Sequence, residues 1–258
     1  MIDPSARIDP TAEIGEDVEI GPWVSIGAGV RIGARTRIGS HCVLMGPTEI
    51  GADNHIFPFC SIGDHPQDKK YTVGAGESRL VIGNGNVIRE YCSINRGTPG
   101  GGGVTRLGDD NWIMAYCHVA HDCQVGSHTV FANNTTLAGH VEIADYVILG
   151  GFTGIHQFCR MGEGSFSAIA AIIVRDVPPF VIVKGNTARP RSINTVGMRR
   201  RGFDAATIAA VKRCYRALFR EGRRLEEALE AVELEAVESA QARAMLEFIR
   251  ASSRGIVR

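Results

Sequence analysis

The sequence lacks any long hydrophobic run. Its longest apolar stretch, Ala168 to Val174, ends at Arg175 and Asp176, well short of the roughly 20 residues that a membrane-spanning helix needs. The first ten residues, MIDPSARIDP, contain no basic segment followed by an apolar one, as a secretory signal would require. We therefore expect a cytoplasmic protein without a membrane span.

Excess charge and paired cysteines are also missing. Lys+Arg and Asp+Glu both number 28, so the overall charge gives no reason to expect nucleic acid or an anionic membrane as a partner. The seven cysteines form no CxxC pair, which argues against a disulfide framework and a structural zinc module. The chain does have 44% hydrophobic residues in 258, enough for a sizeable core.

An aliphatic ladder with a strict six-residue period runs through most of the chain. It breaks near residues 64–79 and 97–105, where we expect inserted loops. The ladder residues are Ile8, Ile14, Ile20, Ile26, Ile32, Ile38, Leu44, Ile50, Ile56 and Ile62, then Ile82, Ile88 and Ile94, then Leu107, Ile113, Val119, Val125, Phe131, Leu137, Ile143, Leu149, Ile155 and Met161.

This period indicates a parallel β-helix of hexapeptide repeats. Glycine often follows the aliphatic residue, and a small or β-branched residue lies four places after it. Each hexad then forms a short strand and a corner, with the aliphatic side chain pointing inward. Resemblance to other hexapeptide proteins implies the left-handed form, with three hexads per coil. We predict such a β-helix over residues 1–197 and a small α-helical domain over residues 198–258.

The same register accounts for six of the cysteines. Each lies four places after a ladder residue, at the small inward position: Cys42, Cys60, Cys92, Cys117, Cys123 and Cys159. Free cysteine packs as a small hydrophobic residue, so we expect packing rather than a thiol nucleophile or metal ligand.

The pattern becomes helical from about Met198. An amphipathic helix is predicted after Asp204, which is a suitable N-cap, and the segments DVPPF and ARP before it indicate an irregular connection. Residues 198–224 carry nine basic and two acidic side chains. Arg213, Arg216 and Arg220 share the face opposite the apolar stripe. Such a face suits an acidic or phosphorylated partner, and a merely solvated face is the alternative.

The register turns four histidines outward: His118, His121, His140 and His156. Residues 18 apart lie on neighbouring coils, which stacks Asp122 against His140 and His121 against Gly139. A carboxylate beside an imidazole orients the ring and raises its basicity, and glycine at position 139 leaves a backbone N–H uncovered for a ligand. Exposed stacking histidines are the alternative.

A zinc site, as in γ-class carbonic anhydrases, is a further alternative, but no two histidines here have the five-residue spacing of those enzymes. The first inserted loop holds Asp68 and Lys70. A long loop on a rigid scaffold commonly carries function, although a solvated charge run has the same composition.

Several segments together resemble one family over essentially the full length, the UDP-N-acetylglucosamine O-acyltransferases of lipid A biosynthesis. The similar segments are MIDPSA, QDKKY, IREYCSINRGT, HVAHDC, ANNTTLAGHV, HQFC, DVPPFVIVKGN and RRRGF. The resemblance implies transfer of an (R)-3-hydroxyacyl group from the phosphopantetheine thioester of acyl carrier protein to the sugar 3-hydroxyl of UDP-N-acetylglucosamine. This is the first step of lipid A biosynthesis, with no bound cofactor and no metal.

The resemblance also implies roles for individual residues. His121 matches the general base, Asp122 the residue that orients it, and Gly139 the backbone N–H that stabilises the oxyanion. Positions that match substrate-binding residues are Asp68, Lys70, His118, His140, His156, Gln157, Asn194, Arg200 and Arg201. Family members are homotrimers with sites between adjacent prisms, and Arg213, Arg216 and Arg220 would dock the acidic carrier protein.

Two positions depart from the family pattern. Val196 stands where an acidic residue is common, which puts a contact to the nucleotide ribose in doubt. Ile169 stands where glycine is common at the end of the acyl channel, so we expect it to select a shorter chain. A 3-amino UDP-sugar acceptor, a γ-carbonic-anhydrase-like metalloenzyme and a non-catalytic scaffold stay open as alternatives.

Overall fold

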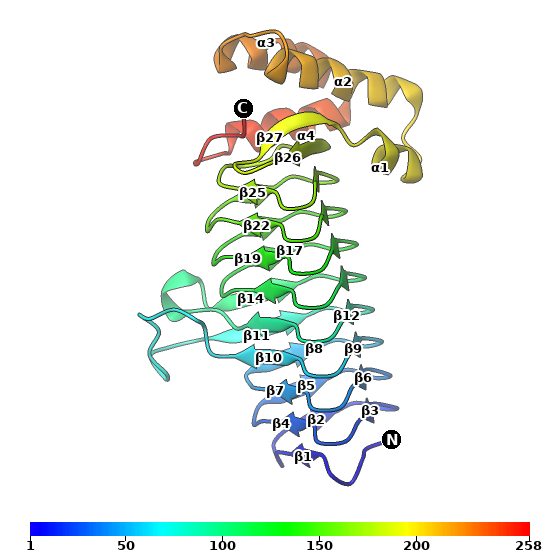
Figure 1. Cartoon of the computed structure of the whole chain (residues 1–258), viewed down its shortest axis with the longest axis vertical. Helices are drawn as coiled ribbons and strands as arrows, with labels where there is room; N and C mark the ends of the chain where they lie inside the picture. The colour runs from blue at the N-terminus through cyan, green and yellow to red at the C-terminus, as the bar shows by residue number, and fades with distance from the viewer.

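The computed structural model describes residues 1–258 and is a left-handed parallel β-helix capped by four helices (Figure 1). Three sheets form the faces of a triangular prism. Sheet I holds β1 (Arg7–Ile8), β4 (Ser25–Ile26), β7 (Val43–Leu44), β10 (Ser61–Asp64), β13 (Ser93–Asn95), β16 (His118–Val119), β19 (Thr136–Leu137), β22 (Gly154–Ile155) and β25 (Ile172–Ile173). Sheet II holds β2 (Glu13–Ile14), β5 (Val30–Ile32), β8 (Thr48–Ile50), β11 (Arg79–Ile82), β14 (Val104–Leu107), β17 (Gln124–Val125), β20 (Glu142–Ile143) and β23 (Arg160–Met161).

Sheet III completes the prism with β3 (Glu19–Ile20), β6 (Arg37–Ile38), β9 (His55–Ile56), β12 (Val87–Ile88), β15 (Trp112–Ile113), β18 (Val130–Phe131), β21 (Ile148–Leu149), β24 (Phe166–Ser167), β26 (Val181–Lys184) and β27 (Arg189–Ile193). Each coil takes one strand from each sheet. Ladder residues pair across coils, for example Val125 with Ile143. The six-residue period therefore corresponds to one face of the prism.

The interior is filled as the register predicts. The ladder residues from Ile20 onward are buried, and so are the six ladder cysteines. Burial raises the pKa of the Cys123 thiol to about 12, so this thiol is protonated and unreactive at neutral pH. The interpretation of these cysteines as packing residues is confirmed.

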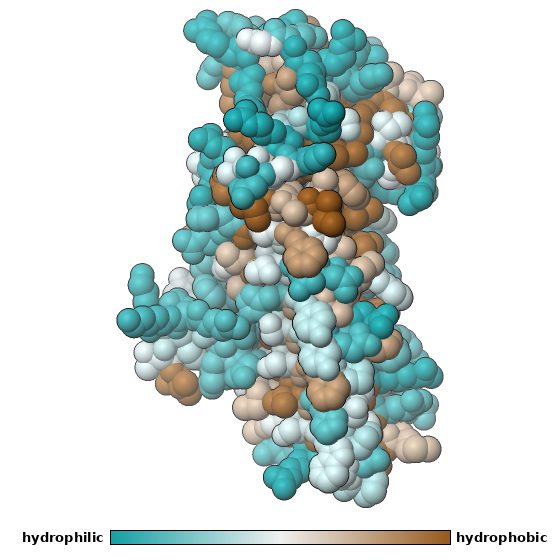
Figure 2. Space-filling view, in the orientation of Figure 1, coloured by the Kyte–Doolittle hydropathy of each residue, from teal (hydrophilic) through white to brown (hydrophobic).

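Residues at the prism corners adopt positive φ, among them Asp122 at 60° and His140 at 61°. The corner residues thereby project their side chains along the prism edges. One edge carries a continuous stack of His41, Phe59, Tyr91 and Tyr116, with ring centroids 4.9 to 5.1 Å apart. Figure 2 shows this edge as a column of stacked rings.

Both inserted loops leave the prism at one corner, between sheets I and II. The first, residues 65–78, connects β10 to β11, and the second, residues 96–103, connects β13 to β14 and contains a short 3₁₀ turn, η1 (Pro99–Gly101). Figure 1 shows them (cyan) on the same side of the prism as the C-terminal segment (red). This corner therefore gathers non-repetitive chain from three places in the sequence.

The helices are α1 (Thr195–Arg200), α2 (Ala205–Phe219), α3 (Leu225–Ala236) and α4 (Ala240–Arg250). The Asp204 side chain accepts a hydrogen bond from the Thr207 N–H, 2.8 Å, so the predicted N-cap is confirmed. The boundary predicted after residue 197 falls inside α1. None of the helices is long and apolar enough to cross a bilayer.

One local prediction is wrong. The ARP segment, residues 188–190, is predicted to be irregular, but Arg189 and Pro190 belong to β27, which pairs antiparallel with β26. Strand β27 is the last strand of sheet III, and an edge strand tolerates proline because one of its sides needs no donor.

Candidate active site

The corner between sheets I and II holds the histidine cluster. His121 and Asp122 follow β16, and the backbone N–H of His140 donates to the His121 carbonyl, 3.0 Å, so the two corners lie on successive coils. This contact confirms the predicted stacking of residues 18 apart. Neither His121 nor His140 is in the core; their side chains are 16% and 24% exposed.

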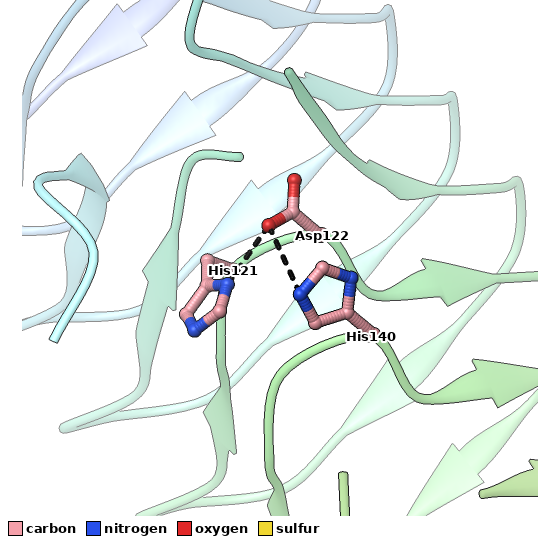
Figure 3. Close-up of side chains that lie close together, drawn as sticks. All are labelled: His121, Asp122 and His140. Carbon is pink, nitrogen blue, oxygen red and sulfur yellow. Dashed lines mark hydrogen bonds and ion pairs between the residues drawn. The ribbon is translucent and has the colours of Figure 1, made fainter. Parts of the chain in front are cut away.

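Asp122 is the buried centre of this cluster (Figure 3). Its side chain is 1% exposed and its Oδ2 lies 2.8 Å from Nδ1 of His121. A carboxylate only accepts hydrogen bonds, so Nδ1 of His121 carries the proton. The other ring nitrogen, Nε2, then has a free lone pair with which to accept a proton.

Thr98 in the second inserted loop holds the Asp122 carboxylate from the other side. Its backbone N–H donates to Oδ1, 2.9 Å, and its hydroxyl donates to Oδ2, 2.6 Å. The Thr105 hydroxyl accepts from the Asp122 N–H, 2.8 Å. Gly101 in the same loop lies so close that a Cβ there would be 2.2 Å from Oδ2 of Asp122.

These positioning residues were not identified from the sequence. The second insertion separates Thr98 from Asp122 by 24 residues, so the 18-residue rule does not relate them. Thr98 ends the segment NRGT, which resembles the family, but the resemblance gives Thr98 no role.

His140 completes the cluster from the next coil. Its Nε2 lies 3.7 Å from Oδ2 of Asp122, its ring meets that of His121 edge-on at 5.2 Å, and it stacks on Phe158 at 4.4 Å. The three residues also have donor atoms within 4.8 Å of one another, as a metal site would need. A metal ion would have to compete with His121 for the same Asp122 oxygen.

Gly139 lies directly beneath the His121 ring. A Cβ on Gly139 would come within 2.6 Å of Cε1 and 2.8 Å of Nε2 of His121. Its backbone N–H has no hydrogen-bond acceptor in the chain. The backbone N–H of Gly139 is therefore free of a hydrogen-bond partner, as expected. Contrary to the expectation, Gly139 is buried, because the imidazole of His121 covers it.

His118 and His156 flank the cluster along sheet I. Nδ1 of His118 lies 2.7 Å from the Ser93 hydroxyl, and burial lowers the pKa of the His118 imidazole, which favours its neutral form. His156 is exposed; its Nδ1 lies 3.1 Å from the Gln157 carbonyl oxygen and 3.4 Å from a guanidinium nitrogen of Arg254. Gln157 is exposed beside it.

Asp68 and Lys70 are carried by the first inserted loop at the same corner. The Asp68 carboxylate accepts from the Lys70 backbone N–H, 2.9 Å, and the Lys70 side chain is exposed. The loop is anchored to the prism because His65 meets the buried guanidinium of Arg96, Nδ1 to NH2 2.6 Å, and also contacts Tyr71. The structure thus brings this loop and the histidine cluster to one edge.

Asn194, Arg200 and Arg201 lie elsewhere, around a cavity of about 560 Å³ on sheet III. Asn194 caps α1: its side chain accepts from the Gly197 N–H and donates to the Gly164 carbonyl, each at 2.9 Å. Arg201 pairs with Glu163 and covers the Tyr146 ring. A single chain therefore does not place these residues beside His121.

Val196 and Ile169 are both exposed in the single chain, 59% and 70%. Val196 lines the sheet III cavity. Ile169 lies at the corner between sheets III and I, just before β25.

The basic face of α2 is less free than its sequence indicates. Arg213 is paired with Glu235 of α3, NH2 to Oε2 2.7 Å, and this bond lowers the pKa of the Glu235 carboxyl. Arg220 donates to the Arg191 carbonyl, 2.7 Å. Arg216 is exposed and makes no ion pair. The predicted three-arginine face thus includes one residue whose charge is already used between helices.

Known proteins match this chain along most of its length. The family described as UDP N-acetylglucosamine O-acyltransferase, domain 2, matches residues 176–257, and the bacterial transferase hexapeptide family matches residues 11–46 and 105–139. The acyl-[acyl-carrier-protein]--UDP-N-acetylglucosamine O-acyltransferase of Verminephrobacter eiseniae is 52% identical over 84% of this chain and 83% of its own length. The Janthinobacterium enzyme of the same name is 54% identical over 80% of each chain.

Solved structures agree. The Francisella novicida UDP-N-acetylglucosamine acyltransferase has a TM-score of 0.97 at 41% identity, covering 100% of this chain and 94% of that one. Together with the histidine cluster on a hexapeptide prism, these matches show that the chain belongs to the family of acyl-[acyl-carrier-protein]–UDP-N-acetylglucosamine O-acyltransferases.

Proposed function

We propose that His121 is the general base of this acyltransferase, which moves an (R)-3-hydroxyacyl group from acyl carrier protein to the 3-hydroxyl of UDP-N-acetylglucosamine. The observation that carries this proposal is the 2.8 Å contact between Nδ1 of His121 and the buried carboxylate of Asp122. That contact leaves Nε2 free to accept a proton, and it stabilises the imidazolium that forms.

The chemical steps follow from this arrangement. Nε2 of His121 takes the proton of the sugar hydroxyl as its oxygen attacks the thioester carbon. A new C–O bond forms and the carbonyl oxygen becomes an oxyanion, for which the unpaired N–H of Gly139 is the proposed donor. The intermediate then collapses, the C–S bond breaks, and the imidazolium returns its proton to the leaving thiol.

Substrate recognition would involve the residues that surround this base. Asp68, Lys70, His118, His140, His156 and Gln157 lie along the same corner and sheet, within reach of a sugar nucleotide lying on it. Asn194, Arg200 and Arg201 face the cavity on sheet III, and we assign them to a site completed by the neighbouring prism of a homotrimer.

The outward side chains support such an assembly. On sheet III they are apolar at Val130, Ile148 and Phe166, and on sheet I they are small at Thr136 and Gly154. Sheet II carries a charged ladder instead, for example Glu142 paired with Arg160 at 2.9 Å. Apolar and small surfaces favour protein contact and charged ones favour water.

The carrier protein is proposed to dock on the basic α-helical end. All three arginines of that face are exposed, but Arg213 is paired with Glu235 and would first have to leave it. An acidic carrier would be attracted over a distance of about 8 to 10 Å at ordinary salt.

The decisive experiment is acyl transfer from a panel of acyl-carrier-protein thioesters to UDP-N-acetylglucosamine and to its 3-amino analogue, with product mass as the readout. We expect a product acylated at the 3-hydroxyl. Transfer to the amino sugar alone would move the assignment to that acceptor. No transfer, together with stoichiometric transition metal by elemental analysis, would favour a metalloenzyme.

Thr98→Val tests how Asp122 is held. The change keeps the backbone N–H and the side-chain shape but removes the hydroxyl that donates to Oδ2. Hydrogen bonds to charged groups contribute about 1.5–3 kcal/mol, so kcat is expected to fall about tenfold or more with little change in KM for the sugar nucleotide. Thr98→Ser should restore kcat. Full activity in the valine variant would show that the hydroxyl does not position the carboxylate.

Ile169→Gly tests the acyl selectivity. A branched side chain at the end of the acyl channel would shorten it, so the glycine variant is expected to accept longer acyl chains than the native protein. Competition assays with donors of graded length measure this. If the native protein shows no length preference, or prefers the longest donor, the role of Ile169 is excluded.

A further inference from the structure

The C-terminal segment, residues 252–258, folds back onto the corner that carries the histidines. Asp176, which is fully buried, holds it: its Oδ2 accepts from the Ser252 hydroxyl at 2.6 Å, its N–H donates to the Gly255 carbonyl at 3.1 Å, and its carbonyl accepts from the Val257 N–H at 2.9 Å. Arg254 lies between these anchors, so its backbone is fixed on the prism.

Arg254 is a cation that lacks an acidic partner. Its NH2 lies 3.4 Å from Nδ1 of His156, and its Nε is buried without any hydrogen-bond acceptor. The nearby Asp176 carboxylate is engaged elsewhere, by Ser252 and by the Arg160 N–H at 2.9 Å. Arg175, exposed on the same corner, also makes no ion pair, and its guanidinium lies close to Gly255. Two arginines without an ion pair therefore lie at this corner, Arg254 against His156 and Arg175 against Gly255.

The register gives the distance between these arginines and His121. Residues 121, 139 and 157 occupy the same corner on successive coils, as the bonds from His140 N–H to His121 O and from Phe158 N–H to Gly139 O show, and the pairing of Ile155 with Ile173 places Arg175 at this corner on the next coil. Coils are spaced by about 4.7–4.9 Å, so Arg175 lies about 14 Å above His121 and His156 about 10 Å above it. An extended phosphopantetheine arm measures about 15 Å from phosphorus to sulfur, as four to five extended residues do.

We propose that Arg254, with Arg175, binds the phosphodiester of the carrier protein's phosphopantetheine arm, so that the thioester at the other end of the arm reaches His121. This inference rests on the proposed function. Arginine suits this role because its guanidinium pairs with phosphate through two parallel hydrogen bonds, and the guanidinium of Arg254 makes no ion pair that an incoming anion would have to displace.

The direction of the arm fits the position of the helices. The proposed docking face for the carrier protein is on α2, at the C-terminal end of the prism, and the inserted loops lie lower on the same side as the C-terminal segment (Figure 1). The arm would descend along the corner from Arg175 and Arg254, past Gln157, to Gly139 and His121. The C-terminal segment would thus hold the phosphate end of the arm at a fixed distance from His121, in addition to covering the end of the prism.

The experiment compares three donors with the same acyl group: acyl carrier protein thioester, acyl-phosphopantetheine and acyl-pantetheine, which lacks the phosphate. With Arg254→Gln we expect KM for both phosphorylated donors to rise about ten- to hundredfold, as for loss of a charged hydrogen bond. KM for acyl-pantetheine and for the sugar nucleotide should not change. Arg254→Lys should restore part of the affinity, and Arg106→Gln, an exposed arginine of sheet II, is the control without effect.

An equal rise in KM for acyl-pantetheine, which has no phosphate, would overturn the proposal. A rise confined to the KM of UDP-N-acetylglucosamine, whose diphosphate is the competing anion, would also overturn it. If Arg254→Gln lowers the melting temperature, the exposed Arg175→Gln gives the same comparison in a stable background. Acyl transfer by the native protein from all three donors establishes the activity separately. If the Arg254 variants then behave like the native protein, only the phosphate-binding proposal is wrong, and the proposed function stands.

Discussion

His121→Ala is expected to lower kcat at least a hundredfold while leaving the melting temperature of the protein unchanged. Positioned base catalysis contributes about 10² to 10⁴ in rate, and the substitution removes both the base and the group that Asp122 orients. The side chain lies on the outside of the prism and supports no part of the core, so stability should hold. Steady-state kinetics with saturating donor and thermal unfolding measure the two quantities.

A matched control separates this effect from the loss of any exposed imidazole. His41 also occupies a corner position with positive φ and stacks on Phe59, but on the edge between sheets III and I. His41→Ala should retain full kcat. If His121→Ala were active, or if both variants lost activity alike, the assignment of the base would be wrong.

Ile143→Ala is expected to do the opposite, lowering the free energy of unfolding by about 2 to 5 kcal/mol while kcat per folded molecule stays close to native. The Ile143 side chain is 2% exposed and pairs in register with Val125 and Met161. Removing its methyl groups leaves a cavity that the rigid coils around it cannot close. Chemical denaturation with activity measured on the folded fraction provides the test.

The control for Ile143 is the same kind of truncation on the surface. Leu234 in α3 is 77% exposed, and Leu234→Ala should change the unfolding free energy by less than about 0.5 kcal/mol. If His121→Ala lowered the free energy of unfolding and Ile143→Ala did not, the assignment of residues to the inside and the outside of the prism would be wrong.

The position of the histidine pair could be predicted from the chain because a β-helix is periodic. Counting along the ladder from Leu137 to Ile143 assigns a face of the prism to every residue between them. Asp122 and His140 were matched in this way, and their side chains do meet, at 3.7 Å. The same rule placed the cysteines inside, because each coil repeats one backbone path.

The contacts of the inserted loops could not be predicted in the same way. Thr98 reaches Asp122 only because the second insertion folds back across the corner, and Gly101 is required there by a close contact that has no signature in the period. The Arg213–Glu235 pair is similar, since it depends on how α2 packs against α3. Such contacts are set by packing between segments, which local pattern does not encode.

By itself, then, the sequence determined the prism, its hydrophobic column and the outward direction of the histidines. In a six-residue repeat, the position of a residue within the hexad decides whether its side chain points into the prism or out of it. Tertiary structure alone decided that Thr98 and Gly101 enclose Asp122 and that Arg254 returns to His156. These contacts join segments whose separations follow no period, so only the folded chain brings them together.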